Sequence, residues 1–239
     1  MPFLSGISTL IFPQKCLLCA AHKEHISIET GRCKSCSEIS QFSVKSTRRG
    51  GIEIFTGTHY SPQMARLILA AKESDQKFAR RFLAQSILAS LKFAIANHTQ
   101  PKNNERKIIL IPIPSRSGAN RLRGYAHILK LIDEISILNT HHKLQQINCL
   151  AHKKRIKDQS SLNFYEREQN MKEAFGVISK GIEQIIAIDS KEEFAPLIFL
   201  VDDLVTSGAT VLAANIALNR AGIRVSGVLS SCATNRFTH

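Results

Sequence analysis

Two adjacent carboxylates, Asp202 and Asp203, are the residues best suited to chemistry in this chain. Five apolar residues at 197–201 come directly before them and predict a strand that is buried on both faces. In open α/β sheets, the carboxyl end of such a strand faces the crevice where ligands bind. Two carboxylates there can accept hydrogen bonds from a vicinal diol, such as the hydroxyls of a ribose. The sequence therefore predicts Asp202 and Asp203 as ligand-binding and catalytic groups.

The segment after the carboxylates has the composition of an anion-binding loop. A helix is predicted to follow it, so backbone N–H groups, hydroxyls and the positive end of the helix dipole converge on the loop. Gly208 lets the backbone approach an anion closely. The loop residues are Thr206, Ser207, Gly208, Ala209 and Thr210. Carboxylates that can bind a diol, followed by a loop that can bind an anion, predict a ribose 5-phosphate as the ligand. The structural alternative is a solvent-facing acidic turn before an ordinary helix that has Thr206 or Ser207 as its N-cap.

Four cysteines near the N-terminus form two pairs, Cys16-x-x-Cys19 and Cys33-x-x-Cys36. Two such knuckles can place four thiolates tetrahedrally around one Zn²⁺ ion, in a closed site with a structural role. A redox pair usually comes as a single motif, and disulfides are disfavoured inside cells. The sequence therefore predicts structural zinc at Cys16, Cys19, Cys33 and Cys36.

The balance of charge favours partners that carry phosphate. The chain has 239 residues, with 32 Lys and Arg against 19 Asp and Glu, which gives a net charge of +13. Such a field attracts nucleic acids and anionic surfaces. Aromatic residues make up only 6% and Trp is absent, which argues against a broad platform for stacking bases. The residues Lys153, Lys154, Arg155 and Lys157 form a basic run that suits a partner of this kind. A mobile basic surface loop without a catalytic role is the alternative for this segment.

The hydropathy of the sequence contains no membrane-spanning signal. No apolar run approaches the length of about 18 residues that a transmembrane helix requires. Residues 1–12 are mildly apolar but lack the basic start and the small-residue cleavage site of a signal peptide. We therefore expect a cytoplasmic protein, with the inner face of the cytoplasmic membrane as an alternative position.

The elements that must position these residues alternate between strands and helices. Apolar and alternating runs predict strands at 52–60, 107–114, 147–151, 197–201 and 223–230. Helical spacing predicts helices at 63–71, 76–96 and 124–135, and within 205–221, where Gly222 is predicted to cap the end. This alternation predicts an α/β fold with a parallel, doubly wound sheet and flanking helices.

A polar, basic connector is predicted at 46–51, ahead of these elements. Its glycine pair, Gly50-Gly51, marks a break in the pattern. We therefore expect two units, a small zinc-binding domain with four cysteine ligands at 1–45 and a larger domain at 52–239.

At this point the sequence resembles the ComF family, whose ComFC-type competence proteins join an N-terminal zinc knuckle to a type I phosphoribosyltransferase-like domain. The resemblance spans almost the whole chain, and its motifs stand in the family's order. They are residues 10–19, Ile111-Pro112-Ile113-Pro114 with Arg121-Leu122-Arg123-Gly124-Tyr125, Gln159-Ser160-Ser161-Leu162 with Arg167, Asn170 and Ala174-Phe175, and residues 200–210. The family usually has Asn-Gln after the Arg-Gly-aromatic triplet, where this chain has Ala126-His127. Residues 176–195 are longer than usual, and we assign them no function.

The resemblance implies a binding site for 5-phosphoribosyl 1-diphosphate (PRPP) together with Mg²⁺. Arg121 and Arg123 lie in a loop after a predicted strand, and their guanidinium groups suit a diphosphate. A solvated basic loop is the alternative. Residues 152–170 fall where type I phosphoribosyltransferases have a flexible loop that closes over the diphosphate and excludes water.

Three functions fit these expectations. The first is a competence factor that handles DNA during natural transformation and carries a PRPP-type site. It binds single-stranded DNA, for which the candidate contacts are Lys153, Lys154, Arg155 and Lys157. Its candidate partners are competence proteins such as a DNA-translocating helicase. The second is a metabolic phosphoribosyltransferase that acts on a nitrogen base. The third is a PRPP-binding module that has lost catalysis.

Overall fold

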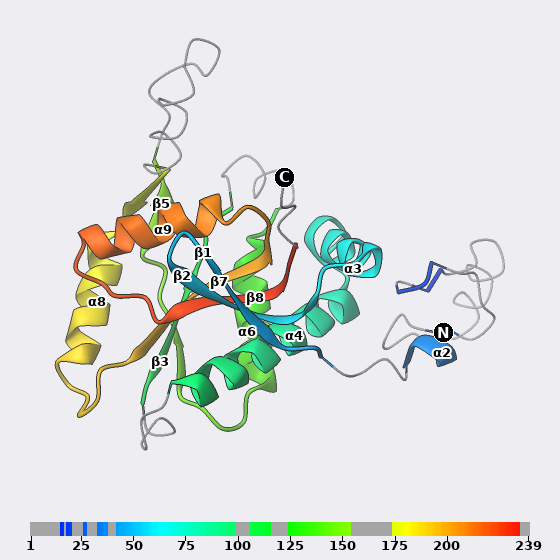
Figure 1. Cartoon of the computed structure of the whole chain (residues 1–239), viewed down its shortest axis with the longest axis horizontal. Helices are drawn as coiled ribbons and strands as arrows, with labels where there is room; N and C mark the ends of the chain where they lie inside the picture. Colours follow the sequence, from blue (N-terminus) through cyan, green and yellow to red (C-terminus); the bar gives the residue numbers. More distant parts are fainter. Residues whose placement is uncertain are drawn as a thin grey trace, which may run out of the picture.

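A six-stranded, mostly parallel sheet forms the centre of the structure, which is a computed structural model (Figure 1). The structure describes residues 15–16, 18–20, 26–27, 33–37, 42–98, 106–115, 124–153 and 174–234. The strand order is β1-β2-β8-β7-β3-β4, where β1 pairs antiparallel with β2 and the other pairs are parallel. The strands are β1 (Lys45–Arg49), β2 (Ile52–His59), β3 (Ile108–Pro112), β4 (Leu144–Gln146), β7 (Leu197–Val205) and β8 (Gly227–Ala233).

Helices cover both faces of this sheet, as Figure 1 shows. Their bounds are α3 (Pro62–Glu73), α4 (Lys77–Asn97), α6 (His127–Leu138), α8 (Ser179–Asp189) and α9 (Ala209–Arg220). α3, α4 and α6 contribute to one hydrophobic cluster, whereas α8 and α9 contribute to a second one on the other face. The α/β class with a parallel sheet and flanking helices is therefore confirmed.

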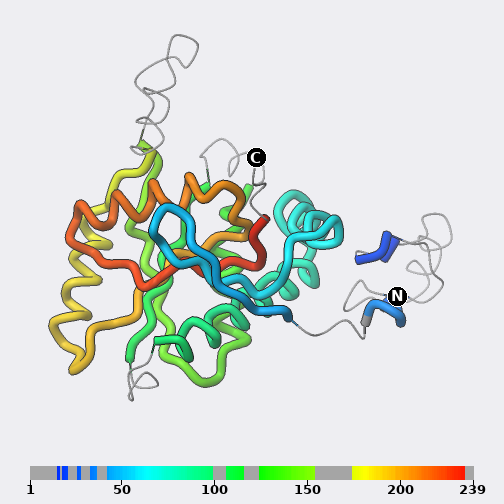
Figure 2. Tube along the Cα trace, in the orientation of Figure 1, coloured from blue at the N-terminus to red at the C-terminus, as the bar shows by residue number. Residues whose placement is uncertain are grey.

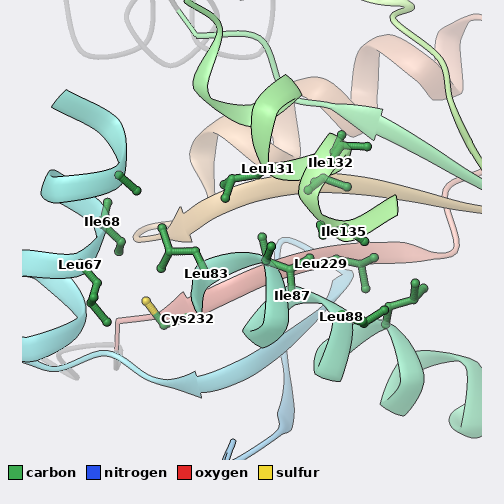
Figure 3. Close-up of a cluster of buried hydrophobic side chains, with 14 of the residues drawn as sticks. Leu67, Ile68, Leu83, Ile87, Leu88, Leu131, Ile132, Ile135, Leu229 and Cys232 are labelled. Carbon is green, nitrogen blue, oxygen red and sulfur yellow. The ribbon is translucent and has the colours of Figure 1, made fainter. Parts of the chain in front are cut away.

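The first cluster joins three helices to the middle of the sheet (Figure 3). Leu83 and Ile87 of α4 are fully buried and lie near Leu131 of α6 and Leu229 of β8. Their spacing of four residues along α4 puts Leu83 and Ile87 on one helix face, as the sequence pattern predicts. α3 begins at a Ser61 N-cap, whose Oγ accepts a hydrogen bond of 3.2 Å from the Met64 N–H.

The central strands are apolar along most of their length because helices cover both of their faces. All five residues of β3 and the first five of β7 are buried. β7 nevertheless continues beyond 201, where the sequence predicts its end. Asp202 pairs with Ser230, and Val205 pairs with Ala233, because β8 supplies ladder partners that far. Asp202 and Asp203 therefore lie within the last part of β7 rather than after it.

Three other predicted elements differ from the structure. The connector at 46–51 is instead β1 and a turn, in which Gly50 and Gly51 have φ values of +58° and +83°. The helix predicted from 124 begins at His127, since Gly124 has a φ of +75° that no α-helix accommodates. The strand predicted at 147–151 is replaced by β4 in the main sheet and by β5 (Leu150–His152), which pairs antiparallel with β6 (Phe175–Val177).

The remaining described elements complete the chain. Residues 176–195 contain the end of β6 and the helix α8. The predicted cap at Gly222 is confirmed, with a φ of +80° directly after α9. Around the cysteines, α2 (Lys34–Ser37) follows an isolated bridge between Ile26 and Cys33. Within the described ranges, no helix has the length and apolar character that crossing a membrane requires.

Candidate functional site

Asp203 occupies a buried position between two helices and is only 3% exposed. Its Oδ2 lies 3.0 Å from the Lys72 Nζ in the last turn of α3 and 3.4 Å from the His127 Nε2 at the start of α6. Its backbone oxygen accepts hydrogen bonds from the hydroxyls of Ser230 and Ser231 in β8. Three elements far apart in sequence thus hold Asp203 in one place.

These neighbours decide the charge of Asp203. Burial alone raises the pKa of a carboxyl, because it disfavours the charged form. At Asp203 the nearby His127 and the ammonium of Lys72 outweigh burial and hold the pKa well below its usual range. Asp203 is therefore a fixed negative charge at neutral pH.

Asp202 has a different environment although it is the next residue. It is half-buried, and its Oδ1 accepts a hydrogen bond of 2.9 Å from the Asp203 N–H. Burial raises the pKa of Asp202 well above its usual range, and the negative charge of Asp203 raises it further. Two neighbouring carboxyls whose pKa values are pushed apart are typical of acid–base sites, in which one group exchanges a proton while the other stays ionised.

Tyr125 fixes the end of α3 that carries Lys72. Its hydroxyl lies 3.0 Å from the carbonyl oxygen of Ala71 and 2.7 Å from that of Lys72. Both are carbonyls near the C-terminus of a helix, where backbone acceptors lack intrahelical partners. The Lys130 Nζ lies 4.1 Å from the centre of the Tyr125 ring. Tyr125 thus connects the segment before α6 with the ion pair of Lys72 and Asp203.

His127 is fully buried at the first residue of α6. Apart from the approach to Asp203, neither ring nitrogen of His127 has a hydrogen-bond partner in the described part of the chain. Buried polar groups usually have such partners. An imidazole in this position is therefore unusual and belongs to the same cluster as the two carboxylates.

The predicted anion loop lies between the end of β7 at Val205 and the start of α9 at Ala209. Thr206, Ser207 and Thr210 are exposed, whereas Gly208 is buried and is the N-cap residue of α9 with a φ of +85°. The alternative in which Thr206 or Ser207 is the N-cap is wrong, because Gly208 takes that position. The Ser207 Oγ accepts a hydrogen bond of 3.3 Å from the Ala209 N–H, but Gly208 itself has no side chain to cap the helix.

Arg49 is a residue of this region that the sequence analysis missed. It ends β1, is 4% exposed, and donates hydrogen bonds to the carbonyl oxygens of Val205 and Thr234. Figure 2 shows the tip of the β1–β2 hairpin beside α9. Only the Arg48-Arg49 pair before two glycines signals it in sequence, and that pair is typical of a polar connector.

The four paired cysteines lie together, as their spacing predicts. Their sulfur atoms are all within 4.8 Å of one another, and the Cys19 Sγ lies 3.9 Å from the Cys33 Sγ. Zn–S bonds of about 2.3 Å require about 3.8 Å between sulfurs at the edge of a tetrahedron. All four cysteines are free thiols rather than disulfides. The cluster could therefore hold a metal ion such as zinc.

Burial and hydrogen bonds shift the pKa values of two of these thiols in opposite directions. The Cys33 N–H lies 3.4 Å from the Cys16 Sγ. Burial raises the pKa of Cys16, but hydrogen bonds from the backbone of Cys19, Cys33 and Leu18 lower it to about 6 overall. Burial, together with hydrogen bonds to the other three thiols, raises the pKa of Cys36 to about 12. A metal ion must therefore displace a proton from Cys36, while Cys16 is already disposed to be a thiolate.

Several predicted site residues cannot be placed. Arg121 and Arg123, the candidates for holding a diphosphate, lie outside the described residues. The same applies to Lys154, Arg155 and Lys157 of the candidate DNA contact. Lys153 is described and is exposed after β5.

No model of a known protein family matches the chain, and no curated protein matches it in a sequence search.

Proposed function

We propose that the chain binds a ribose 5-phosphate ligand such as PRPP at the carboxyl end of β7. The observation that carries this proposal is the position of Asp202 and Asp203 in the last part of β7, followed after a short loop by an α9 N-terminus whose N-cap is Gly208. Thr206, Ser207 and Thr210 are exposed residues just before and at that helix start, where backbone N–H groups lack intrahelical partners. A sugar hydroxyl pair and its 5-phosphate therefore have partners on adjacent stretches of chain.

The two carboxyls have separate tasks in this proposal. Asp202 is the half-buried one, and it accepts hydrogen bonds from the ribose hydroxyls. Asp203 stays ionised beside Lys72 and orients its neighbour through the Asp203 N–H, which donates to the Asp202 Oδ1. Burial and the charge of Asp203 raise the pKa of Asp202, which favours Asp202 as the carboxyl that holds a proton.

Mg²⁺ belongs to the diphosphate of PRPP in this account, with Arg121 and Arg123 as further contacts. Carboxylate oxygens are ligands that Mg²⁺ prefers, and Asp202 offers them at this end of the sheet. When bound, Mg²⁺ neutralises the charge of a diphosphate leaving group. The chain's own residues bind and orient the sugar.

The finer fold and the family belong to the same proposal. The parallel sheet, the strand–loop–helix unit of β7 and α9, and the cysteine cluster are what a ComF-type protein with a type I phosphoribosyltransferase-like domain requires. We therefore propose membership of that family and a role in DNA uptake during natural transformation. Single-stranded DNA would bind through basic residues that include Lys153.

A phosphoribosyltransferase reaction is the second candidate, and the unequal pKa values of Asp202 and Asp203 favour it. In that reaction the bond from C1 of the ribose to the diphosphate breaks, a bond from C1 to a nitrogen of the acceptor forms, and diphosphate leaves. The acceptor's proton needs a base, and a carboxyl with a raised pKa can take it up.

A complementation assay in a strain that lacks the chain and an activity assay on the purified chain separate these functions. Complementation with the Asp202→Ala/Asp203→Ala double variant is expected to leave transformation impaired, whereas the wild-type chain restores it. The purified chain is then incubated with PRPP, Mg²⁺ and each common nucleobase, and diphosphate release is followed. Restored transformation by the double variant would contradict a role of the ligand site in DNA uptake, and diphosphate release would establish the transferase.

A further inference from the structure

The guanidinium of Arg49 lies beneath the start of the anion loop. Its Nη1 is 3.4 Å from the carbonyl oxygen of Val205, and its Nη2 donates to the carbonyl oxygen of Thr234. Val205 ends β7 directly before the loop, and Thr234 follows the last residue of β8. The two carbonyls therefore hold the planar guanidinium between the ends of two neighbouring strands.

The aliphatic part of Arg49 packs against the loop itself. A Cβ added to Gly208 would lie 3.0 Å from the Arg49 Cβ and 3.1 Å from its Cδ. The neighbouring Gly50 approaches α9 in the same way, because a Cβ there would lie 3.0 Å from the Leu212 Cδ1. Both the loop and the first turn of α9 thus rest on the end of β1.

This arrangement adds a permanent positive charge below the N-terminus of α9. An arginine stays protonated at any ordinary pH. The helix dipole points its positive end to the same place. At 4% exposure, water screens the charge of Arg49 far less than that of a surface arginine.

We infer that Arg49 sets the preference of the loop for a dianionic phosphate ester over a singly charged anion of the same shape. This inference rests on the proposed function, in which the loop receives the 5-phosphate. A phosphate monoester carries close to two negative charges at neutral pH, since its second pKa is about 6. A sulfate ester has the same tetrahedral shape but one charge. The attraction to Arg49 grows with the charge of the ligand, whereas hydrogen bonds to the loop are available to both.

The test compares ribose 5-phosphate with ribose 5-sulfate on the full chain by calorimetry. The wild type is expected to bind the phosphate about tenfold more tightly than the sulfate, and Arg49→Gln to reduce that ratio to about twofold. Arg49→Lys retains the charge and is expected to retain most of the ratio. Arg48→Gln is the matched control, because Arg48 is the exposed neighbour on the same strand and its loss leaves the ratio unchanged.

The ratio separates a role in specificity from simple damage to the loop. A damaged loop weakens both ligands equally and leaves the ratio at its wild-type value, which would overturn the inference. If Arg49→Gln does not fold by circular dichroism, Arg49→Lys and Arg49→Met are compared instead, and equal ratios there would overturn it as well. If the wild type binds neither ligand, both the proposed function and this inference are wrong. If the wild type binds both ligands and Arg49→Gln has the same affinity ratio, only the inference is wrong.

Discussion

The carboxylate of Asp203 lies 3.0 Å from the ammonium of Lys72, although 131 positions separate the two residues in the chain. This ion pair joins the end of α3 to the carboxyl half of β7, next to the residue that we expect to meet the ligand. The carboxylate is almost fully buried, whereas the Lys72 side chain is 31% exposed. The site is therefore assembled from two distant segments, and its charge depends on their contact.

Replacing Lys72 with Met should lower the stability of the fold. The change removes the ammonium that lies beside the buried carboxylate of Asp203. Because the lysine is partly exposed, we expect the free energy of unfolding to fall by about 1–3 kcal/mol. The pKa of Asp203 is depressed in the folded state, so its stabilising effect is present above the unfolded pKa of about 4 and is lost as the pH falls further. Urea unfolding of wild type and Lys72→Met at pH 7 and at pH 3 measures the free energy of unfolding of each protein.

The stability difference between wild type and Lys72→Met should therefore narrow at the lower pH. Lys77→Met serves as control, because Lys77 is exposed at the start of α4. A difference of equal size at both pH values would contradict an ion pair with Asp203.

Asp202→Asn should stabilise the protein and weaken its ligand binding. The pKa of Asp202 is raised in the folded state, so the carboxyl opposes folding at a pH above its unfolded pKa of about 4, where the unfolded chain has lost the proton. Removal of the ionisable group should raise the melting temperature at pH 8, with a smaller gain at pH 4, and should weaken PRPP binding by about 1–3 kcal/mol. Such an exchange of stability for function is common at active sites.

The control for this prediction is Asp189→Asn, since Asp189 is an exposed carboxyl at the end of α8. It should change neither the melting temperature nor the affinity appreciably. A lower melting temperature in Asp202→Asn would show that Asp202 has a structural role instead.

The cysteine cluster should hold one tightly bound zinc ion per chain. Cys16→Ser or Cys33→Ser should lose the metal, because the site needs all four thiolates. The six-stranded sheet and its flanking helices should stay folded, although Arg66 of α3 donates a hydrogen bond to the Leu18 carbonyl beside the cluster. Metal analysis of the purified protein measures the zinc content.

Cys149→Ala is the matched control for the zinc site, since Cys149 is buried in the hydrophobic cluster to which α8 and α9 contribute. It should retain the wild-type metal content. Less than about half an equivalent of zinc in freshly purified wild type would argue strongly against a structural metal site.

Neutralising the basic residues after β5 should weaken binding to single-stranded DNA. The variant replaces Lys153, Lys154, Arg155 and Lys157 with Gln. With fewer phosphate contacts, DNA binding releases fewer counterions. The logarithm of the affinity should therefore fall less steeply with the logarithm of the salt concentration. The control variant replaces four exposed basic residues elsewhere with Gln, namely Lys180, Lys191, Arg220 and Arg224. An unchanged slope in the first variant would contradict a DNA contact at these residues and would direct the search to the cysteine segment.

The sequence predicts those parts of the fold that rest on local composition. β3 and β7 begin as continuous apolar runs, and α4 repeats buried residues every four positions, so both classes of element can be identified without tertiary information. β1 is different, since Lys45–Arg49 contains no apolar residue and forms a strand because β2 supplies its ladder. Its assignment as a connector is wrong for that reason.

Local sequence likewise predicts one part of the candidate site and not the other. The cysteine cluster and the 202–210 segment are each local in sequence, and their spacing alone indicates their chemistry. Lys72, His127 and Arg49 reach the same region from α3, α6 and β1, and no pattern near them in the sequence points to Asp203 or Gly208. Contacts between distant segments depend on the packing of the sheet and its helices, which single-sequence patterns do not contain.

Calorimetry with PRPP and Mg²⁺ on Gly208→Val and Gly222→Val tests the central claim most directly. Both glycines have a positive φ near the two ends of α9, of +85° and +80°, so a valine meets similar backbone strain at either position. Only position 208 lies in the anion loop, where a side chain also meets Arg49. The account predicts that wild type and Gly222→Val bind PRPP alike, whereas Gly208→Val shows no binding at about 1 mM ligand. Equal binding by both variants, or no binding by the wild type, would contradict a ribose 5-phosphate site at the end of β7.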